Sequence, residues 1–305
     1  MRFAVPDNTV LINDGGLATE LEARGHDLSD ALWSARLLVD APQAITAAHA
    51  AFFRAGAMIA TTASYQASLD GFAARGIGRP AAVRLWARSV ELARAARDAV
   101  TDEVGDSGRW VAASIGPYGA ALADGSEYRG RYGLTVAQLA RWHRPRLEVL
   151  AGAGADVLAL ETIPDVDEAE ALIGLVQAAG VPAWLSYTID GDRTRAGQPL
   201  ADAFAAVAGV DEIVAVGVNC CAPADVLGAV RTAREASPDL RKPVIVYPNS
   251  GESWDAKRHA WTGGRQFSAN LARQWASEGA RIVGGCCRVR PADIARVADQ
   301  LGGLG

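Results

Sequence analysis

The feature of this sequence that most limits its fold is a repeated alternation between short apolar runs and helical patterns. Each run is rich in Val, Ile and Leu and precedes a loop rich in Gly or polar residues. Runs that do not alternate with polar residues are typical of parallel strands buried on both faces. The runs cover residues 9–13, 57–62, 110–115, 156–160, 183–189, 212–219, 243–247 and 281–284.

Helical patterns fill the segments between these runs. Asp165 is a predicted N-cap with Glu168 three residues later, and Pro223 and Pro291 lie where a first helical turn would begin. Eight strands alternating with about eight helices predict an α/β chain folded as a (β/α)8 TIM barrel. An open doubly wound sheet is the alternative, but its glycine fingerprint is missing from residues 14–19, DGGLAT.

The length of 305 residues would allow two domains, but a barrel of this kind takes about 250 residues by itself. No low-complexity segment or charge block divides the chain, so we expect a single domain over residues 1–305. Two connections are unusually long, residues 64–79 and residues 116–134. The second contains Tyr118, Tyr128 and Tyr132 and is expected to form an ordered cover.

The composition excludes several other classes of protein. Half of the residues are hydrophobic and 21% are charged, which is typical of a globular chain and not of a disordered one. The net charge of −5 predicts no nucleic-acid partner. Residues 171–189 carry no charge, but the break at residues 180–182 favours a helix followed by a strand over a membrane span. With no secretory signal recognised, we expect a cytoplasmic protein with reduced thiols.

Polar and reactive residues gather where the apolar runs end. In a barrel these carboxyl ends converge on one mouth, which is where active sites lie. Four cysteines belong to this set, and they occur as two adjacent pairs. The set comprises Asp14, Thr61, Thr62, Ser114, Glu161, Asn219, Cys220, Cys221, Asn249, Ser250, Cys286 and Cys287.

The spacing of the cysteines leaves three interpretations open. Buried cysteines can act as small apolar side chains, and adjacent cysteines can form a redox pair. Three thiolates with one open position would instead suit a catalytic zinc ion.

A set of motifs spread over nearly the whole chain resembles one known family, the homocysteine S-methyltransferases. The similarity is strongest to the branch that uses S-methylmethionine or S-adenosylmethionine as the methyl donor. The motifs are DGGLATEL (14–21), LWSA (32–35), ASYQAS (63–68), SIGPYGA (114–120), GSEY (125–128), ETIP (161–164), GVNC (217–220), YPNSGE (247–252) and GGCC (284–287).

The resemblance implies a zinc-dependent barrel whose metal ligands are Cys220, Cys286 and Cys287. It implies transfer of a methyl group from a sulfonium donor to the zinc-bound thiolate of homocysteine, giving methionine. Cys221 is not part of the family pattern and is expected to fill space. Both partners of the reaction would be small molecules, and nothing in the sequence indicates an oligomeric state.

The resemblance also assigns the remaining site residues. Glu161 is expected to bind the ammonium group of homocysteine, although a capping or surface carboxylate is the alternative. The expected homocysteine contacts are Asp14, Gly15, Thr62, Ser114, Glu161 and Asn219. Tyr65 and Tyr118, on the two long connections, are expected to face the sulfonium of the donor, since aromatic rings attract such cations.

Other functions remain open at this point. The betaine-using branch of the same family shares the zinc motif, but residues 114–128 resemble the sulfonium-using branch more closely. A zinc hydrolase on the same fold would use His and carboxylate ligands, and a redox sensor built on the cysteine pairs would bind no metal. His49 shares a helical face with Ile45 and Phe52, so it is expected to be a core histidine with its hydrogen bonds satisfied.

Overall fold

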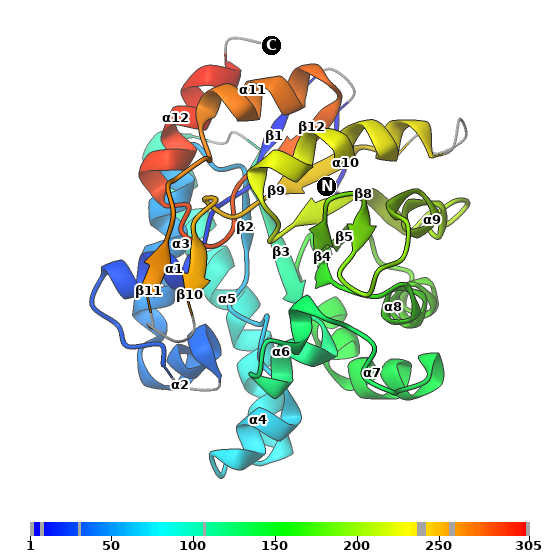
Figure 1. The fold of residues 1–305 in the computed structure, drawn as a ribbon. Coiled ribbons are helices and arrows are strands. Elements are labelled where there is room, and N and C mark those ends of the chain that lie inside the picture. Colours follow the sequence, from blue (N-terminus) through cyan, green and yellow to red (C-terminus); the bar gives the residue numbers. More distant parts are fainter. Residues whose placement is uncertain are drawn as a thin grey trace.

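A computed structural model describes residues 3–6, 9–29, 32–105, 108–236, 242–255 and 260–302. In this part of the chain eight parallel strands form one sheet, in the order β1-β12-β9-β8-β5-β4-β3-β2 (Figure 1). The strands are β1 (Leu11–Ile12), β2 (Ile59–Thr61), β3 (Trp110–Ile115), β4 (Val157–Ile163), β5 (Ala183–Tyr187), β8 (Ile213–Asn219), β9 (Val244–Tyr247) and β12 (Ala280–Val283).

The two ends of this sheet meet, which makes it a barrel. Asn13 and Ile59 form a parallel bridge, and the backbone N–H of Met58 donates to the Ile12 carbonyl at 2.7 Å. All eight predicted strands are present, so the (β/α)8 TIM barrel prediction is confirmed.

Helices surround the barrel and connect its strands (Figure 1). They are α1 (Leu17–Ala23), α2 (Leu37–Asp40), α3 (Pro42–Arg54), α4 (Leu69–Ala74), α5 (Arg79–Val104), α6 (Tyr118–Leu122), α7 (Val136–Gly152), α8 (Val166–Ala179), α9 (Leu200–Ala205), α10 (Pro223–Glu235), α11 (Ala269–Ser277) and α12 (Pro291–Leu301). Two 3-10 turns join them, η1 (Trp33–Arg36) and η2 (Ser126–Tyr128). Pro223 and Pro291 each occupy the first helical position, as predicted.

The uncharged stretch at residues 171–189 is the end of α8 followed by β5. Gly180 ends the helix with a φ of 63°, a conformation that glycine adopts without steric cost. Asp165 caps α8, and its carboxylate accepts from the Asp167 N–H at 3.2 Å. The Glu168 carboxylate does not take part in this cap, because it accepts from the Tyr118 N–H at 2.6 Å. The N-cap prediction therefore holds, whereas the expected pairing with Glu168 does not. Within the described residues, no helix combines the length and apolar character that crossing a bilayer requires.

Side chains pack the interior of the barrel toward its amino end. Phe3 packs against Trp110 and Trp184, with ring centroids 5.5 and 6.4 Å apart. Small residues such as Ala112 and Ala159 leave room in the same cluster for the large rings. The interior is thus closed on this side, and a ligand site must open at the carboxyl ends of the strands.

The long connections are partly helical. Residues 64–79 contain α4, and residues 116–134 contain α6 and η2; we call these segments the first cover and the second cover. Two antiparallel hairpins were not expected, β6 (Ile189–Asp190) with β7 (Arg193–Thr194), and β10 (Ser253–Asp255) with β11 (Ala260–Thr262). Elements of two to six residues are too short to show a recognisable period in the sequence.

Candidate active site at the carboxyl ends of the strands

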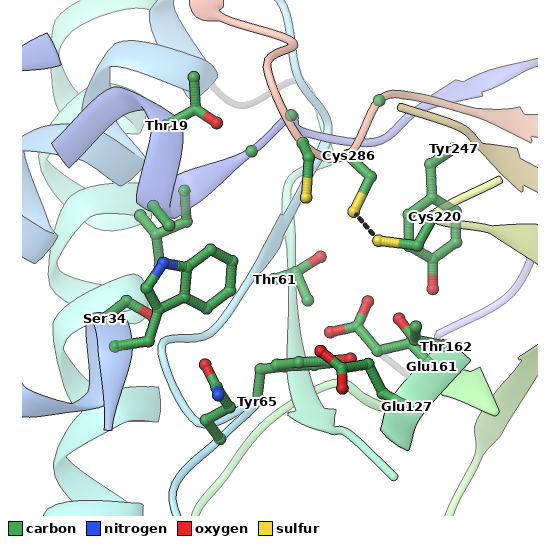
Figure 2. A pocket seen from close by; sticks show the side chains of 18 of the residues that line it. Thr19, Ser34, Thr61, Tyr65, Glu127, Glu161, Thr162, Cys220, Tyr247 and Cys286 are labelled. Carbon is green, nitrogen blue, oxygen red and sulfur yellow. Dashed lines mark hydrogen bonds between the residues drawn. The ribbon is translucent and has the colours of Figure 1, made fainter. Parts of the chain in front are cut away.

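A cavity of about 510 Å³ opens at the carboxyl ends of the strands, beneath the two covers (Figure 2). Strand ends, η1 and both covers contribute to its walls. Its polar and aromatic lining consists of Asp14, Thr19, Ser29, Trp33, Ser34, Thr61, Thr62, Tyr65, Gln66, Glu127, Tyr128, Glu161, Thr162, Cys220, Tyr247, Cys286 and Cys287.

Three cysteine sulfurs meet at one side of this cavity. The Sγ atoms of Cys220, Cys286 and Cys287 all lie within 4.8 Å of one another, and those of Cys220 and Cys286 are 2.7 Å apart (Figure 2). Two thiolates on a tetrahedral zinc ion are about 3.8 Å apart, given Zn–S bonds of ~2.3 Å. The Cys220–Cys286 distance is shorter than this, so these two sulfurs would separate when a single thiophilic ion binds the group.

Local backbone conformation brings these sulfurs together. Cys220 follows β8 with a φ of +49°, which turns its side chain out of the alternation of the strand. After β12, Gly284 and Gly285 are needed for space: a Cβ on Gly284 would lie 2.7 Å from the Asp14 carbonyl oxygen, and one on Gly285 would overlap Val289. Neither glycine has a positive φ, so the expected bend depends on close packing and not on glycine's conformational freedom.

The three thiols differ in the direction in which their pKa is shifted. Hydrogen bonds from Cys220 and Cys286 lower the pKa of Cys287 well below that of an ordinary thiol. Hydrogen bonding to Cys220 and Cys287, together with burial, raises the pKa of Cys286. For Cys220 a hydrogen bond from Cys286 lowers the pKa, but its interaction with Cys287 and burial outweigh this and raise it. Three thiolates therefore need a bound cation to coexist here.

Cys221 lies apart from this group. It is 1% exposed and belongs to the apolar core around the barrel, and burial raises the pKa of its thiol. This placement agrees with the expectation that Cys221 fills space.

Asp14 and Gly15 form the cavity wall after β1. The Asp14 carboxylate accepts from the Thr61 N–H at 2.7 Å and from the Thr61 hydroxyl at 3.1 Å. Burial nevertheless raises its pKa well above the usual range. A Cβ on Gly15 would lie 2.5 Å from the Val289 carbonyl oxygen, so glycine lets this segment pass close to the loop after β12.

Glu161 ends on the cavity, with Ser114 directly behind it. The Ser114 hydroxyl donates to Glu161 Oε1, and Ser114 itself is fully buried and does not line the cavity. Burial raises the pKa of Glu161 to about 7, opposed by this hydrogen bond. Thr62 lines the cavity, but its Oγ1 already accepts from the Ser114 N–H at 3.0 Å and lies 2.8 Å from Ser64 Oγ.

Asn219 lies behind the cavity and holds the backbone that follows Glu161. Its amide accepts from the Thr162 N–H at 2.7 Å and donates to the Thr162 hydroxyl at 2.7 Å. Thr162 has a φ of +60°, an unusual conformation that these two bonds stabilise. Ser186 also donates to the Asn219 oxygen, and its Oγ lies 2.6 Å from the Tyr247 hydroxyl at the cavity wall.

The two residues predicted to bind the methyl donor differ in position. Tyr65 lines the cavity and packs against Trp33, with ring centroids 6.3 Å apart. Tyr118 is not among the described lining residues, and its ring packs against Tyr132 and Trp142 at 5.2 and 5.1 Å. The structure thus brings Tyr65, and not Tyr118, to the other site residues.

Several lining residues were not among the ligand contacts expected from the sequence. Thr61 holds Asp14, whereas Thr62 had been proposed for the site. Glu127 and Tyr128 reach the cavity from η2, on the same side as Cys220. The signal that could have found the last two is an acidic–aromatic pair inside a long, glycine-flanked connection.

The buried guanidinium of Arg146 binds the backbone of both covers. Arg146 of α7 donates to the Tyr65 carbonyl at 3.0 Å and to the Gly116 carbonyl at 2.6 Å, so one guanidinium ties the two covers together. His143 accepts from the same guanidinium at 3.2 Å and lies 2.8 Å from Glu168. Burial lowers the pKa of Arg146 to about 10, still far above neutral pH.

Comparisons with known proteins point to the same family as the sequence motifs. A family model described as homocysteine S-methyltransferase matches residues 11–301. A protein of Escherichia coli K12 named homocysteine S-methyltransferase is 46% identical over 301 residues, which are 97% of this chain and 96% of that protein. A selenocysteine Se-methyltransferase of Brassica oleracea is 41% identical over 308 residues, covering 95% and 88% of the two chains. The crystal structure of the Escherichia coli homocysteine methyltransferase MmuM in its metallated form aligns with a TM-score of 0.86 and 45% identity, covering 97% of this chain and 96% of that one.

Proposed function

The chain belongs to the homocysteine S-methyltransferase family, and we propose that it uses a zinc ion and a sulfonium donor to convert homocysteine to methionine. The observation that carries this proposal is the cluster of three cysteine sulfurs on the wall of a cavity large enough for two small substrates. We also propose that residues 1–305 act as one domain, since the family model spans 11–301. The need for reduced thiols supports a cytoplasmic location.

The donor set supports zinc as the metal. Cys220, Cys286 and Cys287 are soft ligands in a partly buried site, and the cavity beside them leaves space for one further ligand. When bound, a zinc ion would supply the positive charge that stabilises the homocysteine thiolate, the form of the thiol that acts as a nucleophile.

The transfer itself requires alignment more than acid–base chemistry. A lone pair of the homocysteine thiolate forms a bond to the methyl carbon as the donor's bond between sulfur and that carbon breaks. The electron pair of the broken bond stays on the donor sulfur, which becomes a neutral thioether, and the thiol proton goes to solvent. The protein's main task is to hold the two sulfurs in line on either side of the methyl group.

Glu161 is the residue we propose for the homocysteine ammonium group. Its carboxylate faces the cavity on the same side as Cys220, and a bound ammonium would favour its ionised form (Figure 2). Ser114 orients this carboxylate from behind, and Asn219 fixes the backbone that follows it. Asp14, Gly15 and Thr62 complete the wall on the side of β1 and β2.

Tyr65 is the aromatic residue we propose for the donor side. It lies on the first cover and lines the cavity, and its ring face suits a sulfonium cation. Tyr118 is better placed to support the second cover through Tyr132 and Trp142.

Product formation from defined donors tests this function. The zinc-loaded protein is incubated with homocysteine and, separately, S-methylmethionine, S-adenosylmethionine or betaine, and methionine is measured, with homocysteine omitted as the control. Homocysteine-dependent methionine from one of the two sulfonium donors is expected. Methionine from betaine alone would point to the betaine-using branch, and none from any donor would refute the proposal.

A further inference from the structure

Glu127 is a half-buried carboxylate of the cavity that the proposed function has not used. It belongs to η2 on the second cover and lines the same cavity as the cysteines. Its Oε2 is shielded from solvent and has no hydrogen-bond partner among the residues that the structure describes. Glu161 differs because its Oε1 is held by the Ser114 hydroxyl.

The position of Glu127 is fixed by its surroundings. Gly119 of α6 packs so closely on η2 that a Cβ there would lie 2.5 Å from the Glu127 nitrogen. Asp124 accepts from the Ser126 N–H at 2.9 Å, and Arg129 donates to the Ser126 hydroxyl at 2.8 Å. These contacts fix the backbone of η2, from which the Glu127 side chain reaches the cavity.

The wall of the cavity carries acidic side chains and no basic ones among its described lining residues. Asp14, Glu127 and Glu161 all line it, and none of its lining residues in the described part of the chain is Lys, Arg or His. A carboxylate oxygen that is shielded from water without a partner, as Glu127 Oε2 is, carries a desolvation cost that a cationic ligand would relieve. The wall therefore favours a ligand that brings its own positive charge.

Glu127 also lies on the reacting side of the cavity. It is close enough to interact electrostatically with Tyr65 and with Cys220, and Figure 2 shows its carboxylate beside Tyr65. Glu161 comes from the end of β4, on the barrel side of the cavity, whereas Glu127 comes from the cover above it. The two carboxylates can thus serve different substrates.

We propose that Glu127 binds the methyl donor by pairing its carboxylate with the sulfonium charge. This inference rests on the proposed function. The sulfonium loses its positive charge as the methyl group moves to the thiolate, so the pairing is stronger before the reaction than in the transition state. Glu127 therefore contributes affinity for the donor and not speed of the chemical step.

Replacement of Glu127 by Gln tests this role, because it removes the charge and keeps the shape. With S-methylmethionine as donor we expect the KM of the donor to rise about 10- to 100-fold, with kcat not reduced and the KM of homocysteine unchanged. Glu127→Asp should recover part of the affinity. Glu170→Gln, an exposed glutamate on α8, is the matched control.

A binding measurement separates a specific role from a structural one. Calorimetry gives the affinities of S-methylmethionine and of methionine, which differ by the sulfonium methyl group but share the ammonium and carboxylate groups. The wild type should prefer S-methylmethionine, and Glu127→Gln should lose most of that preference while keeping its metal and its Tm.

Two results would overturn the inference. Unchanged kinetics of Glu127→Gln with S-methylmethionine would remove Glu127 from donor binding. An equal loss of affinity for S-methylmethionine and methionine would assign the carboxylate to the ammonium group and not to the sulfonium. Failure of the wild type with every donor would instead refute the proposed function, so the two failures are distinguishable.

Discussion

The strand ends and the covers build the two sides of the cavity in different ways. At the strand ends, Cys220 directly follows β8 and Glu161 lies in the last residues of β4, and a hydrogen bond to Asn219 of β8 holds the backbone after Glu161. On the covers, Tyr65 and Glu127 lie in loops whose positions depend on α7 and on packing between short helices. The barrel fixes the first side, whereas contacts between remote segments fix the second. We infer that the strand ends carry the chemistry and the covers select the donor.

The largest effect is expected at the metal ligands, where two adjacent cysteines can be compared directly. Cys220→Ser should lose bound zinc and lower the rate of methionine formation by at least ~1,000-fold, because the ion loses one of its three thiolates. Metal analysis and activity on the same samples check this.

Cys221→Ser is the matched control for that variant. Cys221 lies in the core and outside the sulfur cluster, so this change should lower stability by about 1–2 kcal/mol and leave about one zinc per chain. Equal loss of zinc from both variants would contradict the assignment of Cys220 as a metal ligand and Cys221 as a core residue.

A second prediction sharpens the contrast between the two glutamates. Glu161→Gln should lower kcat/KM for homocysteine by about 100-fold, since the ammonium group would lose its counter-charge. The KM of S-methylmethionine should stay within a few-fold of the wild type. Steady-state kinetics with each substrate varied in turn would show the difference, and a defect confined to the donor would reverse the assignment.

A third prediction concerns the anchor below the covers. Arg146→Lys keeps the positive charge but cannot bind the Tyr65 and Gly116 carbonyls with the geometry of a guanidinium. We expect the KM of the donor to rise about 10-fold and stability to fall by about 1–3 kcal/mol, with zinc content unchanged.

The neighbouring surface arginine provides the control for the anchor. Arg144 is 53% exposed and pairs with Glu148, so Arg144→Lys should behave as the wild type. A loss of zinc in Arg146→Lys would mean that the covers and the strand ends are not independent.

The smallest effect on catalysis is expected at His49, which lies on α3 away from both sides of the cavity. Its ring nitrogens have no hydrogen-bond partner in the described part of the chain, which corrects the expectation of a satisfied histidine. Burial lowers its pKa from 6.5 to about 4.

The pKa of His49 has a defined consequence for acid stability. Above about pH 6.5 the ring is neutral in both the folded and the unfolded chain, so it contributes no pH dependence. Below that pH the unfolded chain takes up the proton first, and folding stability falls by up to about 3 kcal/mol as the pH approaches 4. Urea denaturation across this range should show a shallower acid loss for His49→Leu, with neutral-pH activity retained; identical curves would contradict the buried, neutral state of the ring.

The part of the site that could be predicted from the sequence is the part that the barrel topology positions. Strand ends can be located from apolar runs, so Cys220, Cys286 and Glu161 could be placed at one mouth. Thr61 and Thr62 both line the cavity, and the sequence does not show that Thr61 binds Asp14 whereas Thr62 bonds to Ser114 and Ser64.

The covers could not be predicted in the same way. α4, α6 and η2 are too short to leave a periodic pattern, and Arg146 bonds to carbonyls that lie 30 and 81 residues before it in the sequence. Tyr65 and Tyr118 looked equivalent in the sequence, but only the packing of the second cover turns Tyr118 toward Tyr132 and Trp142.

X-ray absorption at the zinc edge tests the central claim most directly, because it counts the sulfur atoms around the metal. In the protein without substrate we expect three sulfur ligands and one lighter atom. Addition of homocysteine should replace the lighter atom with a fourth sulfur. A metal shell that keeps three sulfurs when homocysteine is bound would contradict activation of the substrate thiol at this site.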